Sequence, residues 1–387
     1  MNTVNWSAIH AKRQGNVVAF FLRPIALIYG LAIRLRLTAY KVGLFGVKSL
    51  PAYVVSIGNI TTGGTGKTPL VAMLAEWADR NGFRVGILSR GYKRKRSRKT
   101  LVVSDGRRVL ASVDEAGDEP FLLAKKLPSV PVLVSKKRYR VGHLALRLFN
   151  SELLLLDDGY QHLSMNRDLN ILLLDAKRQF GNRSLLPLGP LREPPEQARR
   201  ADLIIITKCT DEHPGDDLFD FLQRKYPGRP IFRSGHFPDQ VIFPLAGKVY
   251  SPGFLSGKKV VAFAGLADPD DFLEMVKGLG AHVIHFRAFS DHHPFTRDEI
   301  EELASWKKKS DGDFLLTTEK DWVRTHGKVG ADLDVAILTI RTGLLSGGDT
   351  FFDIIRHGIT KSIKHSATKS PRHKRNDLPY NLGDSVP

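Results

Sequence analysis

The chain has 387 residues, of which 42% are hydrophobic, so it is long and apolar enough to fold around a sizeable core in two domains. Its 58 Lys and Arg residues outnumber its 40 Asp and Glu residues, and the net charge of +18 indicates an acidic partner such as nucleic acid, anionic lipid or a phosphorylated substrate. The only cysteine, Cys209, excludes an intrachain disulfide and a multi-thiolate metal site and fits a reducing, cytoplasmic setting.

The N-terminal segment, 1–48, is basic, and no acidic residue precedes Glu76. Its apolar run, 17–33, contains a single charge, Arg23. A cleaved signal peptide is not expected, because basic residues continue beyond the run, and Arg23 would be costly in a membrane span of about 20 apolar residues. We therefore predict a membrane-associated helix, peripheral or monotopic, on an anionic surface. A core helix with a basic rim is the alternative.

Beyond residue 48, apolar stretches of strand length alternate with helical patterns. The expected strands are 52–57, 83–88, 130–134, 153–156, 169–174 and 203–207, followed by 260–264, 283–286 and 314–317. Helices are expected at 69–81, 269–279 and 296–306. Continuously apolar strands separated by helices are typical of a parallel sheet with helices on both faces, so the predicted fold class is α/β.

Four segments are expected along the chain. The membrane-associated helix in 1–48 is followed by a P-loop NTPase-like domain at 49–228, a smaller α/β domain at 229–345 and an extension at 346–387. The Pro-rich interval 186–195 interrupts the first domain and is expected to be a functional loop. The polar, basic tail from residue 361 has no periodicity and is expected to be disordered.

A glycine-rich loop that ends in Gly66-Lys67-Thr68 lies between the first strand and the first helix of the series. In a phosphate-binding loop, backbone N–H groups surround the phosphates, the lysine reaches the β- and γ-oxygens and the hydroxyl holds magnesium. Thr61 replaces the usual first glycine, but the later glycines can form a comparable turn; an idle glycine turn is the alternative. The predicted nucleotide-binding residues are Thr61, Thr62, Gly63, Gly64, Thr65, Gly66, Lys67 and Thr68.

Two aspartates, Asp157 and Asp158, follow the apolar stretch 153–156. A magnesium-bound triphosphate needs a carboxylate at the end of a neighbouring strand, so the predicted magnesium ligands are Thr68, Asp157 and Asp158. A turn or helix cap is the alternative for the two aspartates. The guanine-recognition pattern is not met, because Asp211 comes one residue late after Lys208, so GTP is a weak alternative.

Several short motifs resemble, in their order, those of the tetraacyldisaccharide 4′-kinase family of the lipid A pathway. With the loop and the N-terminus, the resemblance covers about residues 20–324. The motifs are Ser89-Arg90-Gly91-Tyr92, Gly117-Asp118-Glu119-Pro120, Asp157-Asp158-Gly159-Tyr160-Gln161-His162, Phe180-Gly181-Asn182, the Pro-rich interval through Arg192 and Glu193, Asp291-His292-His293 and Thr317-Thr318-Glu319-Lys320-Asp321.

The resemblance implies an enzyme that uses ATP and Mg²⁺ to phosphorylate the 4′-hydroxyl of an acylated glucosamine disaccharide 1-phosphate. It implies this reaction at the cytoplasmic face of the bacterial inner membrane, with the disaccharide and the anionic membrane surface as partners and no nucleic acid. Domain closure would expel water and align the reacting groups.

The resemblance also assigns roles to single residues. Asp118 would accept the proton of the sugar hydroxyl and His292 would support it, while Lys67 would bind the phosphates. Further active-site positions are the catalytic candidates Arg192 and Glu193 and the substrate candidates Arg90 and Gln161.

Each of these residues also has a structural alternative. Asp118 could cap a helix over 119–126, Arg192 and Glu193 could form a surface ion pair, and the Asp-His-His motif could bind a metal, although neighbouring side chains point apart. The basic cluster at 93–99 could be solvated or could contact lipid phosphate or nucleic acid. The rival functions are a membrane-attached nucleotide switch without a small-molecule acceptor and a nucleic-acid-binding ATPase.

Overall fold

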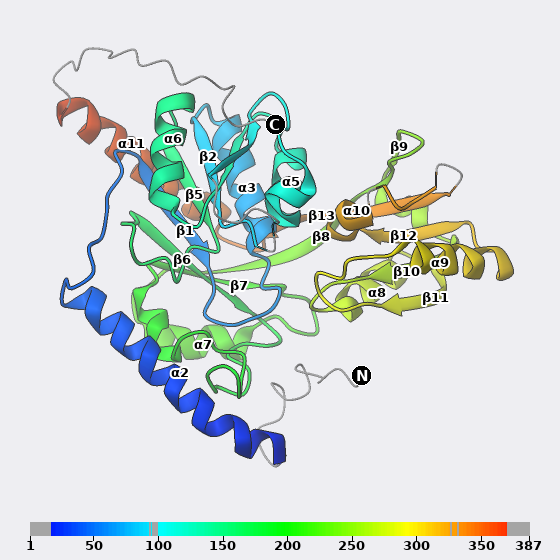
Figure 1. The fold of residues 1–387 in the computed structure, drawn as a ribbon, viewed down its shortest axis with the longest axis horizontal. Coiled ribbons are helices and arrows are strands. Elements are labelled where there is room, and N and C mark those ends of the chain that lie inside the picture. Colours follow the sequence, from blue (N-terminus) through cyan, green and yellow to red (C-terminus); the bar gives the residue numbers. More distant parts are fainter. Residues whose placement is uncertain (1–16, 93, 95–99, 326, 331–332, 370–387) are drawn as a thin grey trace.

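The computed structural model describes residues 17–92, 94, 100–325, 327–330 and 333–369 (Figure 1). Its strands join in one sheet of the order β11-β10-β12-β13-β8-β7-β6-β1-β5-β2-β4-β3, with β9 paired to β8. The strands are β1 (Tyr53–Gly58), β2 (Val85–Ser89), β3 (Leu101–Asp105), β4 (Pro131–Val134), β5 (Leu153–Asp157), β6 (Leu169–Asp175), β7 (Leu203–Thr207), β8 (Ile231–Phe243), β9 (Lys248–Tyr250), β10 (Lys259–Ala264), β11 (His282–Ala288), β12 (Phe314–Thr318) and β13 (Val335–Leu344).

Helices connect these strands. The α-helices are α2 (Val17–Lys41), α3 (Lys67–Arg80), α4 (Val113–Ala116), α5 (Asp118–Lys126), α6 (Arg138–Phe149), α7 (Asp216–Lys225), α8 (Pro269–Gly278), α9 (Arg297–Lys309), α10 (Glu319–Thr325) and α11 (Gly348–Lys369); the 3₁₀ helices are η1 (Pro195–Arg200) and η2 (Pro252–Leu255).

Strand pairing is mainly parallel, with antiparallel pairs only at β3·β4, β8·β9 and β8·β13 among the described strands. The long strand β8 links two parts of the sheet, because its start pairs with β7 in parallel and its later residues pair with β13 in antiparallel register. We call the part from β3 to β7 the first half and the part from β13 to β11 the second half. Figure 1 shows β8 and β13 running between them.

Helices cover both faces of each half. In the first half, α3, α5 and α11 pack on one face, while α6 and α7 bury apolar residues on the other. In the second half, Phe272 and Val276 of α8 pack on one face, and Ile300 and Leu303 of α9 pack on the other. The predicted α/β class is confirmed as a mixed α/β fold around a large, mainly parallel sheet.

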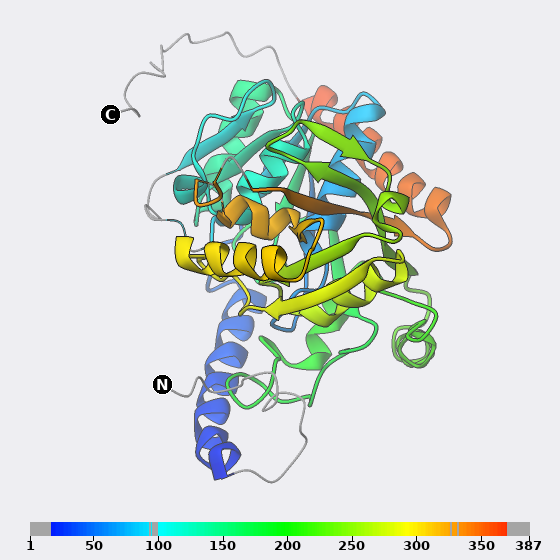
Figure 2. The same ribbon diagram turned by 90° about the vertical axis from the view of Figure 1, so that its right-hand side faces the viewer.

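Helix α2 extends away from the rest of the ribbon (Figure 2). Its residues Phe20, Phe21, Leu27 and Ile28 each expose 66% or more of their surface. The predicted helix is therefore present and longer than 17–33, and the alternative of a core helix is wrong. Among the described residues, no helix has the length and apolarity needed to cross a bilayer.

Two expectations about basic segments need correction. Residues 361–369 belong to α11 rather than to a disordered tail, because Phe351, Ile355 and Ile359 on this helix are buried against the first half. Residues 370–387 lie outside the described residues, as do 1–16. Within the basic cluster, 93 and 95–99 also lie outside, whereas Arg94 is buried and not part of a solvated face.

Candidate active site

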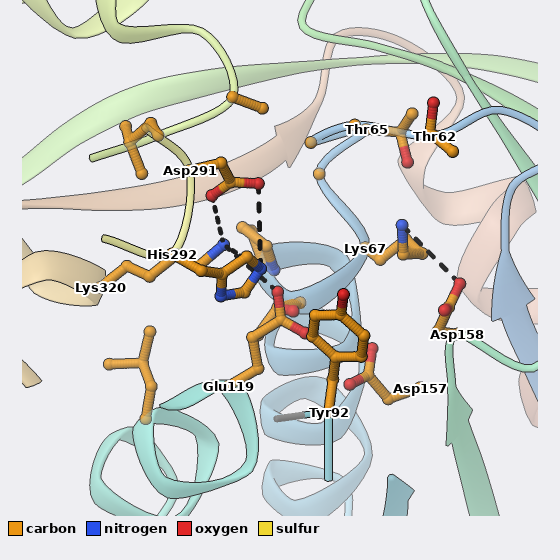
Figure 3. Close-up of a pocket in the computed structure, with 18 of the residues that line it drawn as sticks. Thr62, Thr65, Lys67, Tyr92, Glu119, Asp157, Asp158, Asp291, His292 and Lys320 are labelled. Carbon is orange, nitrogen blue, oxygen red and sulfur yellow. Dashed lines mark hydrogen bonds and ion pairs between the residues drawn. The ribbon is translucent and has the colours of Figure 1, made fainter. Parts of the chain in front are cut away.

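A cavity of about 980 Å³ lies between the two halves of the sheet. The first half contributes the glycine-rich loop and the ends of β2 and β5, while the second half contributes residues of α8, α10 and the loop after β11. Tyr29, Ile33 and Arg36 of α2 line it as well. Figure 3 shows Lys67, Asp157 and Asp158 facing Asp291, His292 and Lys320 across the cavity.

The glycine-rich loop runs from β1 into α3, as a phosphate-binding loop requires. Gly63 and Gly66 have φ angles of 103° and 75°, a conformation that favours glycine. Residues 62–68 line the cavity, so the loop presents its backbone and Thr68 to that space. The predicted position Thr61 does not line the cavity; it is buried and pairs with Leu191.

Lys67 stands at the first residue of α3 and reaches across to the end of β5. Its Nζ donates to Oδ1 of Asn59 at 3.2 Å and lies 3.7 Å from Oδ1 of Asp158. Asp158 has a φ of 51° and accepts hydrogen bonds at 3.0 Å on both oxygens from Nη1 of Arg192. Burial raises the pKa of Asp158, but the charges of Lys67 and Arg192 outweigh it and keep the pKa well below its usual range.

Asp157 is the last residue of β5 and is almost fully buried. Its Oδ2 accepts a hydrogen bond of 3.1 Å from the Ser89 hydroxyl, whereas its buried Oδ1 has no partner among the described residues. Burial, followed by the charges of Glu119 and Asp158, raises the pKa of Asp157 to about 7. A buried carboxylate oxygen without a donor beside a phosphate loop fits a cation ligand.

The predicted magnesium site consists of one hydroxyl, that of Thr68, and the carboxylates of Asp157 and Asp158. No group of three or more His, Cys, Asp or Glu side chains in the described part of the chain forms a metal cluster. Magnesium next to a nucleotide takes only one or two carboxylates from the protein, and its other ligands are phosphate and water oxygens. Thr68, Asp157 and Asp158 all line the cavity, so these residues fit the ion.

A second cluster forms around Asp118, the first residue of α5. Oδ2 of Asp118 lies 2.7 Å from Nδ1 of His292 and 2.7 Å from Nη2 of Arg324, while Oδ1 accepts the amide of Glu119. Asp118 does not cap α5, because the helix begins at Asp118, Gly117 is its cap residue and no side chain caps its start, so the capping alternative is wrong. His292 has a φ of 60° and lines the cavity, whereas Asp118 does not line it and is 11% exposed.

The motif neighbours of His292 point in different directions, as adjacent side chains are expected to do. Lys320 lies 3.5 Å from Nε2 of His292 and 3.3 Å from Oδ1 of Asp291. His293 instead contacts both carboxylate oxygens of Glu299 at 2.9 Å. The motif therefore contributes one imidazole to the cavity rather than a histidine pair for a metal.

The remaining predicted residues divide into two groups. Arg90, Gln161 and Arg192 line the cavity, and Gln161 is fixed by a hydrogen bond of 2.8 Å from its Nε2 to the carbonyl of Asn59. Glu193 is not brought to the cavity: it is fully buried and forms an ion pair with Arg200. Arg192 and Glu193 thus form ion pairs with different partners and not the surface pair considered above.

Sequence reasoning missed other charged residues of the site. Arg138, buried at the start of α6, donates a hydrogen bond of 2.9 Å to the carbonyl of Asp157. Lys208 of the first half contacts Asp268 at 2.6 Å and Asp271 at 3.1 Å, both in the second half. No sequence motif pointed to Arg324. Lys208 was considered only as part of the guanine-recognition pattern, which the sequence does not meet.

Comparisons with known proteins agree with these features. A family model for tetraacyldisaccharide-1-P 4′-kinase matches residues 18–357. Tetraacyldisaccharide 4′-kinase of Geobacter metallireducens is 42% identical over 316 residues, which cover 80% of this chain and 89% of that protein. The protein of that name from Pelobacter propionicus is 42% identical over 307 residues, covering 79% and 83%.

A solved structure is similar as well. The crystal structure of the "apo" form of LpxK from Aquifex aeolicus in complex with ATP has a TM-score of 0.69 and 35% identity, and the match covers 89% of this chain and 100% of that chain. The mixed α/β fold described above is therefore shared with that protein.

Proposed function

The chain belongs to the tetraacyldisaccharide-1-phosphate 4′-kinase family, and we propose that its cavity transfers the γ-phosphoryl group of ATP to the 4′-hydroxyl of an acylated glucosamine disaccharide 1-phosphate. The resemblance inferred from the motifs is thereby confirmed. The observation that carries the proposal is that one cavity is lined both by a phosphate-binding loop with Lys67 and by His292, which is bonded to Asp118.

The loop would bind the triphosphate through its backbone N–H groups and through the Lys67 ammonium group. Thr68, Asp157 and Asp158 would hold Mg²⁺, which when bound neutralises charge on the phosphate oxygens. Arg192 keeps Asp158 ionised and in place next to Lys67. Arg90 lines the same cavity as a further cation for the phosphate groups or the substrate.

The Asp118–His292 pair would take the proton of the acceptor hydroxyl as the new bond to phosphorus forms. Oδ2 of Asp118 already has two side-chain donors, His292 and Arg324, whereas Oδ1 has only the amide of Glu119 and keeps a lone pair for a hydroxyl. Because Asp118 does not line the cavity in this conformation, we expect substrate binding to open access to Oδ1.

The same cavity is lined by helix α2, which explains how a lipid could reach it. Tyr29 donates a hydrogen bond to the carbonyl of Arg192, and Arg36 donates one to the carbonyl of Gln161. The exposed apolar side chains of α2 would enter an anionic membrane surface, at the cytoplasmic face of the bacterial inner membrane. A lipid lying in that surface would meet the cavity beside α2.

The proposed domains follow the two halves of the sheet. A P-loop NTPase-like domain at 49–228 and a smaller α/β domain at 229–345 meet along β8, and α11 from the extension at 346–387 packs against the first. The membrane-associated segment is 1–48.

The test is transfer of labelled γ-phosphate from ATP to an acylated disaccharide 1-phosphate in detergent. We expect lipid-dependent transfer by the unaltered protein and its loss in Lys67→Ala and Asp118→Ala. ATP or GTP hydrolysis that is indifferent to the lipid, with no phosphorylated lipid, would instead favour the membrane-attached nucleotide switch.

A further inference from the structure

The carboxylate of Asp118 is held from the opposite half of the sheet by an arginine. Nε and Nη2 of Arg324 lie 2.9 Å and 2.7 Å from Oδ2 of Asp118, and His292 contacts the same oxygen. Arg324 is on α10 of the second half, whereas Asp118 begins α5 of the first half. Asp118 therefore receives two side-chain donors, and neither comes from its own half.

Arg324 is fixed by contacts within its own half in addition to its contact with Asp118. Its Nη1 donates to the Gly265 carbonyl at 3.0 Å and to Oδ1 of Asp321 at 3.1 Å. Asp321 is fully buried and is itself fixed by the amide of Gly265 and the hydroxyl of Thr318. The Arg324 side chain is only 7% exposed, so its Nε and Nη2 point to Asp118 in a fixed direction, unlike those of a mobile surface arginine.

We propose that Arg324 is a positioning residue for phosphoryl transfer: it docks onto Asp118 as the two halves close and holds the Asp118–His292 pair in its working orientation. This inference rests on the proposed function and deepens it. Arg324 binds Oδ2 of the carboxylate, so Oδ1, which has only the Glu119 amide as a donor, keeps a lone pair for the acceptor hydroxyl.

The contacts also indicate which ring nitrogen of His292 carries the proton that faces Asp118. Nη2 of Arg324 lies 3.2 Å from Nδ1 of His292, and an arginine nitrogen can only donate, so Nδ1–H must point to Asp118 and not to the arginine. Lys320 is on the other side of the ring, near Nε2. A proton on Nδ1 therefore fits the contact with Asp118, and Nε2 is the ring nitrogen that faces Lys320.

The positioning role has a consequence for pH dependence. Burial opposes ionisation of Asp118, but the hydrogen bond from His292 and the charges of Arg324, His292 and Lys320 outweigh it and hold its pKa well below the usual range. Without Arg324 the pKa of Asp118 would rise, so the carboxylate would become protonated, and inactive as a base, at a higher pH. The titratable and charged groups facing Asp118 are Arg324, Lys320, Asp321, His292, Asp291 and Glu119.

A matched control is available on the same two helices. Nζ of Lys126, at the end of α5, contacts Glu319 of α10 at 3.1 Å and the carbonyl of Ile340 at 2.8 Å. Lys126→Met removes an ion pair between the halves without touching Asp118. Because Lys126 also lines the cavity, the variant measures the effect of a weaker contact between the halves together with the loss of one cation of the cavity wall.

The experiment records kcat and KM for phosphate transfer with the full chain, for the unaltered protein and for Arg324→Gln, Arg324→Lys and Lys126→Met. Arg324→Gln should lower kcat about a hundredfold and leave KM for ATP nearly unchanged. Arg324→Lys should recover part of kcat, and Lys126→Met should lose about fivefold or less.

A double variant separates positioning from general loosening. If Arg324 acts through Asp118, Asp118→Asn/Arg324→Gln should be no slower than Asp118→Asn alone. Losses of kcat that multiply in the double variant, or an Arg324→Gln variant that loses no more kcat than Lys126→Met, would overturn the inference while the kinase activity stands. An unaltered protein that transfers no phosphate would overturn the proposed function and this inference together.

Discussion

The two sides of the cavity differ in how far apart in the sequence their residues lie. On the side that would bind the phosphates, Lys67 and Asp158 follow the neighbouring parallel strands β1 and β5, within the first half. On the proton side, Asp118 meets His292 across 174 positions of sequence and Arg324 across 206 positions. The phosphate side is therefore complete within one half, whereas the proton side exists only when both halves are together.

With the roles proposed above, this difference separates nucleotide binding from proton transfer. A loop that is preformed in one half can hold a nucleotide in an open molecule, but a base assembled from both halves can act only after closure. Three non-glycine residues with left-handed backbone, Asp158, Lys208 and His292, line the cavity, and two of them lie at places where the halves meet. Strain of this kind is retained at sites where geometry matters.

The largest effect is expected on the phosphate side. Lys67→Met should lower transfer about a thousandfold and weaken ATP binding, because the ammonium group contacts the phosphates in both the ground state and the transition state. Arg80→Met, at the exposed end of the same helix, is the control and should leave both unchanged. Titration of ATP binding and single-turnover transfer would check this, and normal ATP affinity in Lys67→Met would contradict it.

A smaller loss with a different signature is expected on the proton side. Asp118→Asn should lower kcat about a hundredfold, the usual contribution of a general base, while ATP affinity stays close to that of the unaltered protein. Steady-state transfer together with ATP titration measures both values. If Asp118→Asn weakened ATP binding as much as Lys67→Met, the separation of the two sides would be wrong.

The contact between the halves near α8 should matter less than either side. Lys208 contacts Asp175 of the first half at 3.3 Å and two aspartates of the second half. Lys208→Met should lower kcat/KM about tenfold, because closure becomes less favourable while both chemical groups stay intact. Small-angle scattering with ATP should then show a more open molecule; unchanged compactness with reduced activity would instead assign Lys208 a direct part in the reaction.

The smallest effect concerns stability. His236 of β8 donates to or accepts from the Thr342 hydroxyl at 3.0 Å, and burial followed by the charge of Lys208 lowers its pKa to about 4. The folded protein thus resists protonation that the unfolded chain accepts near its ordinary pKa, so stability is full above about pH 6.5 and falls as the pH drops towards 4. Urea unfolding at pH 8 and at pH 5 should show a smaller pH difference in His236→Gln; an unchanged difference would assign the acid sensitivity to other groups.

The sequence predicted local features well and distant ones only by resemblance. Continuous apolar stretches located β1, β5, β6 and β7 to within a residue or two, because buried parallel strands need no partner to be recognised. Strands β3, β8, β9 and β13, which belong to the antiparallel pairs, were not predicted. The mixed exposure of β8 and the short, partly exposed strands β3 and β9 weaken the apolar signal, whereas the buried start of β13 was simply missed.

The same limit applies to the site. The motif around Lys67 and the pair at Asp157 could be interpreted locally, whereas the partnership of Asp118 with His292 came only from the family resemblance. Arg324 was missed because one arginine in the short helix α10 has no pattern. Glu193 was misjudged because adjacency to Arg192 says nothing about the buried ion pair with Arg200. The helical part of the basic tail was missed because α11 is polar on all but one narrow stripe.

Helix α2 has a kinetic consequence. It places Tyr29, Ile33 and Arg36 in the cavity wall and leaves Phe21, Leu27 and other apolar side chains exposed. With α2 in a lipid surface, as proposed above, the enzyme meets its acceptor within that surface and samples a surface density and not a volume concentration. In mixed micelles its rate should therefore follow the mole fraction of the acceptor lipid, and added detergent should slow it by surface dilution even when the total amount of lipid is held constant.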